Sequence, residues 1–151
     1  DELSGLQDID VVFGGPPCQG FSVAGKMDPD DERSKLLFSF FDVVERVKPR
    51  FFILENVKAL GTLEKWSSTR DAMIAKAHEL GFKHVELIIL NASEYGVPQK
   101  RERMFLIGTN EEHPSSKDSI EEIIKSKKVT APPIKNYFKK HSNTTYYSLL
   151  E

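Results

Sequence analysis

The stretch Val11-Val12-Phe13-Gly14-Gly15-Pro16-Pro17-Cys18 decides the fold class, because an apolar segment ends abruptly in a loop of glycine and proline. We expect 11–13 to form a buried strand. Cys18, the single cysteine of the chain, follows directly. Open α/β sheets bind their ligands at the carboxyl ends of the strands, so this position suits a functional thiol. On its own it suits a buried, inert cysteine better, since such cysteines are more common.

A second apolar run, Phe51-Phe52-Ile53-Leu54, follows Lys48-Pro49 and predicts another fully buried parallel strand. This strand ends in Glu55 and Asn56. Their side chains should therefore lie at the sheet edge that carries Cys18. Taken alone, Glu55 would be more typical of a surface ion pair, and Asn56 is as typical of a turn as of a functional site.

A third segment, Tyr95-Gly-Val-Pro-Gln99-Lys-Arg101-Glu-Arg103, leads into an apolar strand at 104–107. Arg101 and Arg103 are two residues apart, so in an extended chain their side chains point the same way. Such a charged run is usually a solvated face. The preceding Gly-Val-Pro-Gln99, in contrast, favours a functional role for the two arginines.

The three segments resemble, in order and approximate spacing, the catalytic motifs of the cytosine-C5 DNA methyltransferase family: Pro-Pro-Cys18-Gln-Gly-Phe-Ser, Glu55-Asn56-Val57 and Gln99-x-Arg101-x-Arg103. The flanking segments 31–36 and 91–98 resemble that family as well. The resemblance implies a Rossmann-like, S-adenosylmethionine-dependent methyltransferase fold of the α/β class. This chain would hold the carboxyl-side strands of its mostly parallel sheet, with the last two strands as an antiparallel edge.

The chemistry of these residues agrees with that resemblance. Carbon 5 of cytosine is a poor nucleophile until a thiolate adds to C6, and cysteine suits that step. Glu55 can donate a proton to N3 of the ring, which requires a general acid and is favoured if burial raises its pKa. Arg101 and Arg103 can hold the base carbonyl, the carboxylate or a phosphate. The resemblance implies the same roles, on a base flipped out of the duplex.

Further site residues are expected around these four. We expect substrate contacts from Gln19, Ser22, Asn56 and Gln99, although Gln19 and Ser22 are also typical loop residues. The resemblance places Pro17 and Leu36 at the cofactor, S-adenosylmethionine. Helical spacing alone would put Leu36 in the core.

Apolar periodicity predicts the helices. Leu36 to Val47 repeat at helical spacing until Pro49 stops the helix. Ser68-Thr-Arg-Asp71 predicts a capping box for a helix that runs through Leu80 and ends at Gly81. Strands are expected at 85–90 and 104–108, and a short helix at 120–124.

Composition narrows the class of protein. The chain has 151 residues, enough for one domain with a core. A single cysteine excludes an internal disulfide and fits a reducing cytosol, which the resemblance implies to be a bacterial cytoplasm. The four histidines lack metal-ligand spacing, and no apolar run approaches the ~18 residues of a membrane span. The net charge of −2 does not favour a chain that grips DNA alone.

The resemblance also implies parts that the sequence does not show. The glycine-rich cofactor loop is not found before Cys18, and the target recognition region should follow residue 131. We therefore expect a partial catalytic domain at 1–131 and the start of the next region, or a tail, at 132–151. A second chain or a further segment would complete the domain, and the isolated fragment is predicted to be inactive.

The function predicted from these observations is methylation of double-stranded DNA at cytosine C5, in a bacterial restriction-modification system. Two alternatives stay open. One is a transfer-RNA cytosine-C5 methyltransferase of the same family, which Ser67-Ser-Thr-Arg-Asp71 faintly resembles, whereas Gly20-Phe21-Ser22 favours DNA. The other is a DNA-binding remnant without catalysis.

Overall fold

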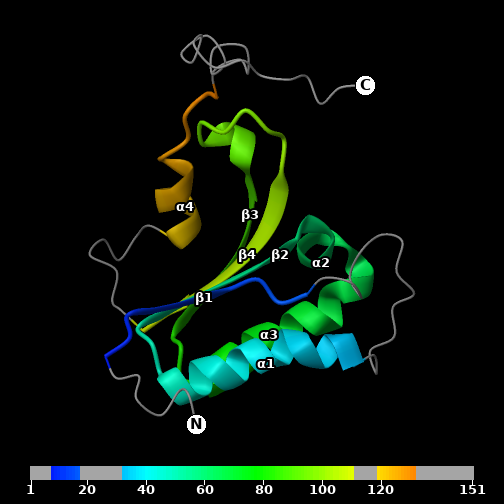
Figure 1. The fold of residues 1–151 in the computed structure, drawn as a ribbon, viewed down its shortest axis with the longest axis vertical. Helices are drawn as coiled ribbons and strands as arrows, with labels where there is room; N and C mark the ends of the chain where they lie inside the picture. Colours follow the sequence, from blue (N-terminus) through cyan, green and yellow to red (C-terminus); the bar gives the residue numbers. More distant parts are fainter. Residues whose placement is uncertain (1–7, 18–31, 111–118, 132–151) are drawn as a thin grey trace, which may run out of the picture.

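The structure, a computed structural model, describes residues 8–17, 32–110 and 119–131. Figure 1 shows the course of the chain through these elements. They are β1 (Val11–Gly14), α1 (Glu32–Val47), β2 (Phe51–Val57), α2 (Lys58–Thr62), the 3-10 helix η1 (Glu64–Trp66), α3 (Ser67–Glu79), β3 (His84–Asn91), the 3-10 helix η2 (Ala92–Glu94), β4 (Glu102–Thr109) and α4 (Ile120–Lys125).

The described strands form one mixed sheet in the order β1-β2-β4-β3. β1 and β2 run parallel, with Val11 opposite Phe51. β4 runs antiparallel to both of its neighbours, β2 and β3. The expected α/β class and the antiparallel pair at one edge are confirmed. Because β4 inserts next to β2, the start of β4 lies beside the carboxyl end of β2.

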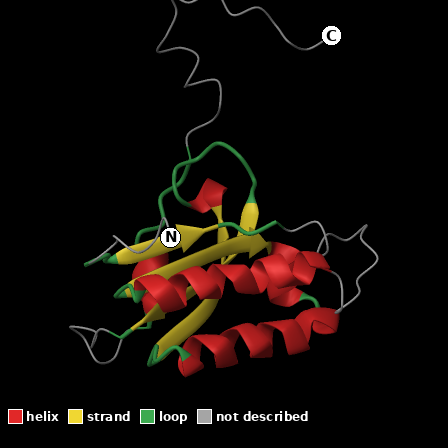
Figure 2. Cartoon of the chain, turned by 60° about the horizontal axis from the view of Figure 1, so that its bottom comes forward, coloured by secondary structure: helices red, strands yellow, loops and turns green. Residues whose placement is uncertain are grey.

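The core lies on the face of the sheet that α1 and α3 cover. Figure 2 shows the two long helices running alongside the strands. Leu37, Phe41 and Val44 of α1 are fully buried, as their helical spacing predicts. Phe52 on β2 is the centre of this packing, with ring centroids 5.7 Å from Phe41 and 4.8 Å from Phe82 in edge-to-face arrangements.

The opposite face of the sheet corrects two expectations. Val11 and Phe13 were predicted to be buried, yet they are 47% and 67% exposed. β2 was predicted to be buried on both faces, yet only alternate residues are buried. The reason is the period of two along a strand: every second side chain points away from α1 and α3. Among the described elements, α4 packs on β3 from that side (Figure 1).

Two expectations about helices are also wrong. Leu36 is 46% exposed and is not part of the core, although it lies on α1. The predicted capping box at 68–71 is absent, because α3 begins at Ser67 without a side-chain cap. The preceding η1 already winds the chain into the helix. The predicted end is confirmed, since Gly81 has a positive φ of 94° just after α3.

The short helix α4 forms where the sequence predicts it. Its N-terminus carries a capping box between Ser119 and Glu122. Glu86 on β3 adds a second anchor, because its carboxylate accepts hydrogen bonds from the backbone N–H groups of Ile120 (2.9 Å) and Glu121 (3.0 Å). These charge-assisted bonds attach α4 to the sheet.

Candidate active site

One small pocket brings together the three segments that the sequence singles out. Its volume is about 170 Å³, and its walls are Gly15, Pro16, Pro17, Glu55, Asn56, Val57, Arg101 and Arg103. The first three residues follow β1, the next three end β2, and the arginines flank the start of β4. The pocket therefore lies at the carboxyl ends of two parallel strands, where α/β sheets bind ligands.

Glu55 and Arg103 form an ion pair across two strands at the pocket. Nε of Arg103 donates to Oε1 of Glu55 over 2.9 Å, and both side chains are about a quarter exposed (26% and 27%). The register explains the pairing, since Arg103 lies opposite Val57 and the side chain of Glu55 is its diagonal neighbour on the same face. Nη1 of Arg103 also donates to the carbonyl of Glu102 over 2.8 Å. These bonds hold Arg103 against the carboxylate.

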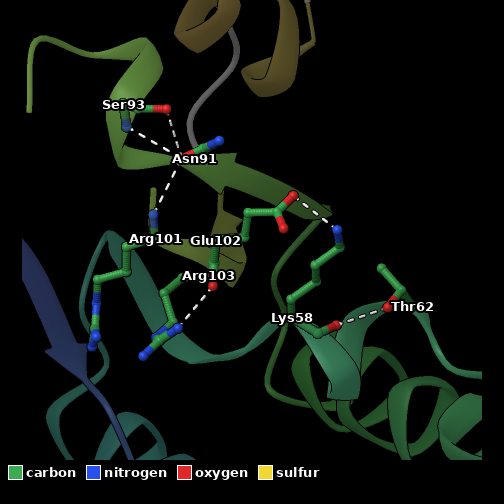
Figure 3. Close-up of polar contacts among 7 residues, drawn as sticks. All are labelled: Lys58, Thr62, Asn91, Ser93, Arg101, Glu102 and Arg103. Atoms are coloured by element: carbon green, nitrogen blue, oxygen red, sulfur yellow. Dashed lines mark hydrogen bonds and ion pairs between the residues drawn. The ribbon is translucent and has the colours of Figure 1, made fainter. Parts of the chain in front are cut away.

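Arg101 lies just before β4, next to Arg103. Figure 3 shows the two side chains extending toward the same side, as their spacing predicts. Both contribute to the wall of the pocket. A guanidinium beside the Glu55–Arg103 pair gives the pocket a further donor for an oxygen of a bound molecule.

Asn56 is held by the protein. It is 2% exposed, and its Nδ2 donates to the carbonyl of Pro16 over 3.2 Å. Its Oδ1 accepts a hydrogen bond of 2.9 Å from the backbone N–H of Val57. Asn56 therefore ties the end of β2 to the loop that leads to Cys18. Its expected contact with substrate stays a prediction.

Gly15 contacts the carboxylate of Glu55, a relationship that the sequence reasoning missed. A Cβ at this position would lie 3.1 Å from Oε2 of Glu55. The absence of a side chain thus lets the loop after β1 approach the acid closely. The adjoining Gly14-Gly15 pair was the available signal, but it indicated only a strand end.

The other predicted residues are placed as follows. Cys18, Gln19 and Ser22 lie outside the described residues; Pro17, which precedes Cys18, lines the pocket. Leu36 is exposed on α1. Gln99 is exposed, and its backbone N–H donates to Val97.

The described part of the chain contains neither a cluster of metal-binding side chains nor a helix that could cross a membrane. No group of three or more His, Cys, Asp or Glu side chains suited to a metal ion occurs within residues 8–17, 32–110 and 119–131. In the same part of the chain, no helix has the length and apolar character needed to cross a membrane.

Comparison with known families decides the identity of the fold. The family model of the C-5 cytosine-specific DNA methylases matches residues 1–150. The chain belongs to this family. The family that the three motifs resemble is therefore the family to which the chain belongs, and in this chain the three motif segments meet in one pocket.

Curated members of the family share substantial identity with the chain. The type II methyltransferase M.DdeI of Desulfomicrobium norvegicum is 42% identical over 113 residues, which are 72% of this chain and 26% of the relative. M1.HphI of Haemophilus parahaemolyticus is 46% identical over 103 residues, 66% of this chain and 27% of the relative. The chain spans about a quarter of the length of these relatives.

Solved structures show the same fold. A putative prophage-encoded DNA modification methyltransferase of E. coli is 36% identical, with a TM-score of 0.52 over 68% of this chain and 27% of that protein. The S. pombe Dnmt2 methyltransferase gives a TM-score of 0.54 over 85% of this chain and 40% of its own, at 20% identity. The second likeness concerns the fold alone.

Proposed function

We propose that this chain carries the catalytic residues of a DNA cytosine-C5 methyltransferase. The observation that carries the proposal is the pocket itself, in which the Pro16-Pro17 loop, Glu55 and the two arginines meet. The substrate is a cytosine of double-stranded DNA, flipped out of the helix because its ring atoms are otherwise unreachable. The type II relatives support a role in a bacterial restriction-modification system.

The proposed reaction begins with the thiolate of Cys18 and the acid Glu55. The sulfur forms a bond to C6, and the electron pair of the C5=C6 bond moves toward C5. For this step Glu55 must carry a proton, which it donates to N3 so that the ring does not accumulate negative charge; Glu55 is then left as the carboxylate that pairs with Arg103. The electron pair at C5 would form the bond to the methyl group, whose bond to the sulfur of the methyl donor would break. A base then removes the proton on C5, the C5=C6 bond re-forms and the sulfur of Cys18 leaves C6. As the sulfur leaves, N3 returns its proton to Glu55, so the thiolate and the acid are both regenerated after each cycle.

The arginines hold the base and the acid in place. Arg103 is bonded to Glu55 and orients its carboxyl group toward the pocket. Arg101, which lines the same pocket, can donate to the carbonyl O2 of the cytosine or to a phosphate. Fixed donors of this kind lower the barrier because they need no rearrangement during the reaction.

The methyl donor in this proposal is S-adenosylmethionine, whose sulfonium supplies an electrophilic methyl group. The chain offers two residues for it, Leu36 on α1 and Pro17 beside the pocket. Both fit the group as apolar surface that the methyl donor can cover, since Leu36 is 46% exposed and Pro17 is exposed as well. The proposed reaction requires no metal.

We also propose limits for the catalytic region. The catalytic region would extend to about residue 131, supported by the bridge between Val129 and Tyr95 of the loop after β3. Residues 132–151 would begin the target recognition region or a tail. A further segment or a second chain would supply the remaining part of the cofactor site.

The decisive test uses the full-length protein that contains this chain. Incubated with duplex DNA carrying 5-fluorocytosine and with S-adenosylmethionine, it should form a covalent adduct, because fluorine at C5 blocks the final proton removal. Cys18→Ser should abolish the adduct. Labelled methyl transfer to duplex DNA and to transfer RNA, measured side by side, separates the two candidate substrates. An intact protein that neither forms the adduct nor methylates either nucleic acid would be the non-catalytic remnant.

A further inference from the structure

The connection between β3 and β4 is closed at its base by one side chain, that of Asn91. Its Oδ1 accepts hydrogen bonds from the backbone N–H of Ser93 (3.2 Å), the hydroxyl of Ser93 (3.0 Å) and the backbone N–H of Arg101 (3.3 Å). Figure 3 shows these contacts meeting at Asn91. A single oxygen thus links the two ends of the ten-residue connection 92–101.

A backbone contact completes this closure. The carbonyl of Arg101 accepts a hydrogen bond of 3.0 Å from the backbone N–H of Ala92. The main chain of Arg101 is therefore held by its N–H and by its carbonyl, from the neighbouring residues Asn91 and Ala92. This is the residue whose side chain enters the pocket with Arg103.

The far part of the same connection is attached independently. The backbone N–H of Val129 donates to the backbone carbonyl of Glu94 over 2.7 Å, and the backbone N–H of Gly96 donates to the carbonyl of Val129 over 3.1 Å. Lys128 adds an ion pair with Glu94. Because these contacts do not involve Asn91, removing its side chain should leave the far part in place and loosen only the base, where Arg101 lies.

We propose that Asn91 is a positioning residue, which acts on the reaction by fixing the main chain of Arg101 and thereby its guanidinium in the pocket. The inference rests on the proposed methyltransferase function. It assigns a task to a residue that lies outside the walls of the pocket.

The chemistry of the contact suggests a sharp set of variants. Asn91 uses only its oxygen, as an acceptor, in all three bonds. Asn91→Asp keeps an acceptor in that place, whereas Asn91→Ala removes it. Asn110→Ala is the matched control, because its Oδ1 also accepts a backbone hydrogen bond, from Lys83 over 3.0 Å, at the opposite end of the sheet.

The experiment measures the rate of adduct formation on 5-fluorocytosine DNA with the full-length protein. Asn91→Ala should slow it by about 100-fold, the effect of displacing a positioning group by about 1 Å. Asn91→Asp should stay within a few-fold of the parent, as should Asn110→Ala. The KM for S-adenosylmethionine should not change, since Arg101 is not expected to contact it.

A double substitution distinguishes positioning from general damage. If Asn91 acts through Arg101, adding Asn91→Ala to Arg101→Ala should cause no further loss. A further loss of the same size would overturn the inference, as would an Asn91→Asp variant as slow as Asn91→Ala while equally folded. An Arg101→Ala variant as fast as the parent would overturn it too. The proposed function is tested separately, because it fails only if Cys18→Ser still forms the adduct or the parent does not.

Discussion

Nε of Arg103 on β4 lies 2.9 Å from Oε1 of Glu55 on β2, so two diagonal neighbours on adjacent strands form an ion pair at the wall of the pocket. An ion pair this exposed contributes little to stability, typically about 0.2–1 kcal/mol. Its consequence should therefore be found in the reaction, where the position of the carboxyl group matters.

Arg103→Ala is expected to slow methyl transfer strongly and to change the unfolding free energy by less than about 1 kcal/mol. Glu55→Gln should slow the reaction by about 10²–10⁴-fold, the range for loss of a general acid. The two effects should be less than additive in the double variant, because the residues act together. Single-turnover rates and urea unfolding provide the measurements. Additive losses would show that the ion pair has no part in the reaction.

Gly15→Ala is expected to impair activity without unfolding the protein. The new Cβ would lie 3.1 Å from Oε2 of Glu55, so the carboxylate would have to move by a few tenths of an ångström. A loss of up to about 10-fold in the rate of methyl transfer is expected, since a full 1 Å displacement costs about 100-fold.

Gly81→Ala is the matched control for Gly15→Ala. At this position φ is +94° and no atom lies within 4 Å of an added Cβ. Alanine there should lower stability by about 1–2 kcal/mol through backbone strain and leave the rate unchanged. Equal effects of both substitutions on rate and stability would contradict the assigned contact of Gly15 with Glu55.

Asn56→Ala should loosen the loop before Cys18. The substitution removes the bond to the carbonyl of Pro16 and leaves buried polar groups without their partner. We expect a loss of about 1–3 kcal/mol in stability and slower adduct formation. Chemical unfolding and the trapping assay report the two effects. If adduct formation is unchanged in the folded variant, Asn56 does not position the loop.

Lys128 should titrate above the ordinary lysine value of 10.5, because its hydrogen bond with Glu94 raises the pKa of the ammonium group. Since the pKa is higher in the folded protein, the stabilising contact is fully present below the ordinary value and is lost as the pH rises through the raised pKa. An NMR titration of the lysine side chains measures this. Glu94→Gln should return the pKa of Lys128 toward its ordinary value; an unchanged titration would exclude the contact as the cause.

Much of the local structure could be predicted from the sequence. The apolar spacing of Leu37, Phe41 and Val44 marks the buried side of α1, because a helix repeats every 3.6 residues. Gly81 marks the end of α3, since its positive φ is strained for other residues. The prediction of a capping box at 68–71 was wrong for a local reason: the 3-10 helix η1 leads directly into α3, which begins at Ser67.

The candidate site could be predicted only in part. The motifs indicated which segments converge, and the pocket contains Glu55, Arg101 and Arg103 together. The bonds of Asn91 to Arg101 and the approach of Gly15 to Glu55 were not predicted. Both depend on distances between residues that are well separated in the chain.

By itself, the sequence determined the four strands, the helices α1, α3 and α4 and the chemical groups at the strand ends, because periodicity and turn residues act over a few neighbouring positions; it did not indicate α2, η1 or η2. The tertiary structure alone decided which face of each strand is covered. Val11 and Phe13 are exposed, whereas Asn56 is buried on a strand whose apolar run gave no sign of its two faces. The reason is physical: burial depends on what packs against a side chain, and those neighbours come from distant parts of the chain.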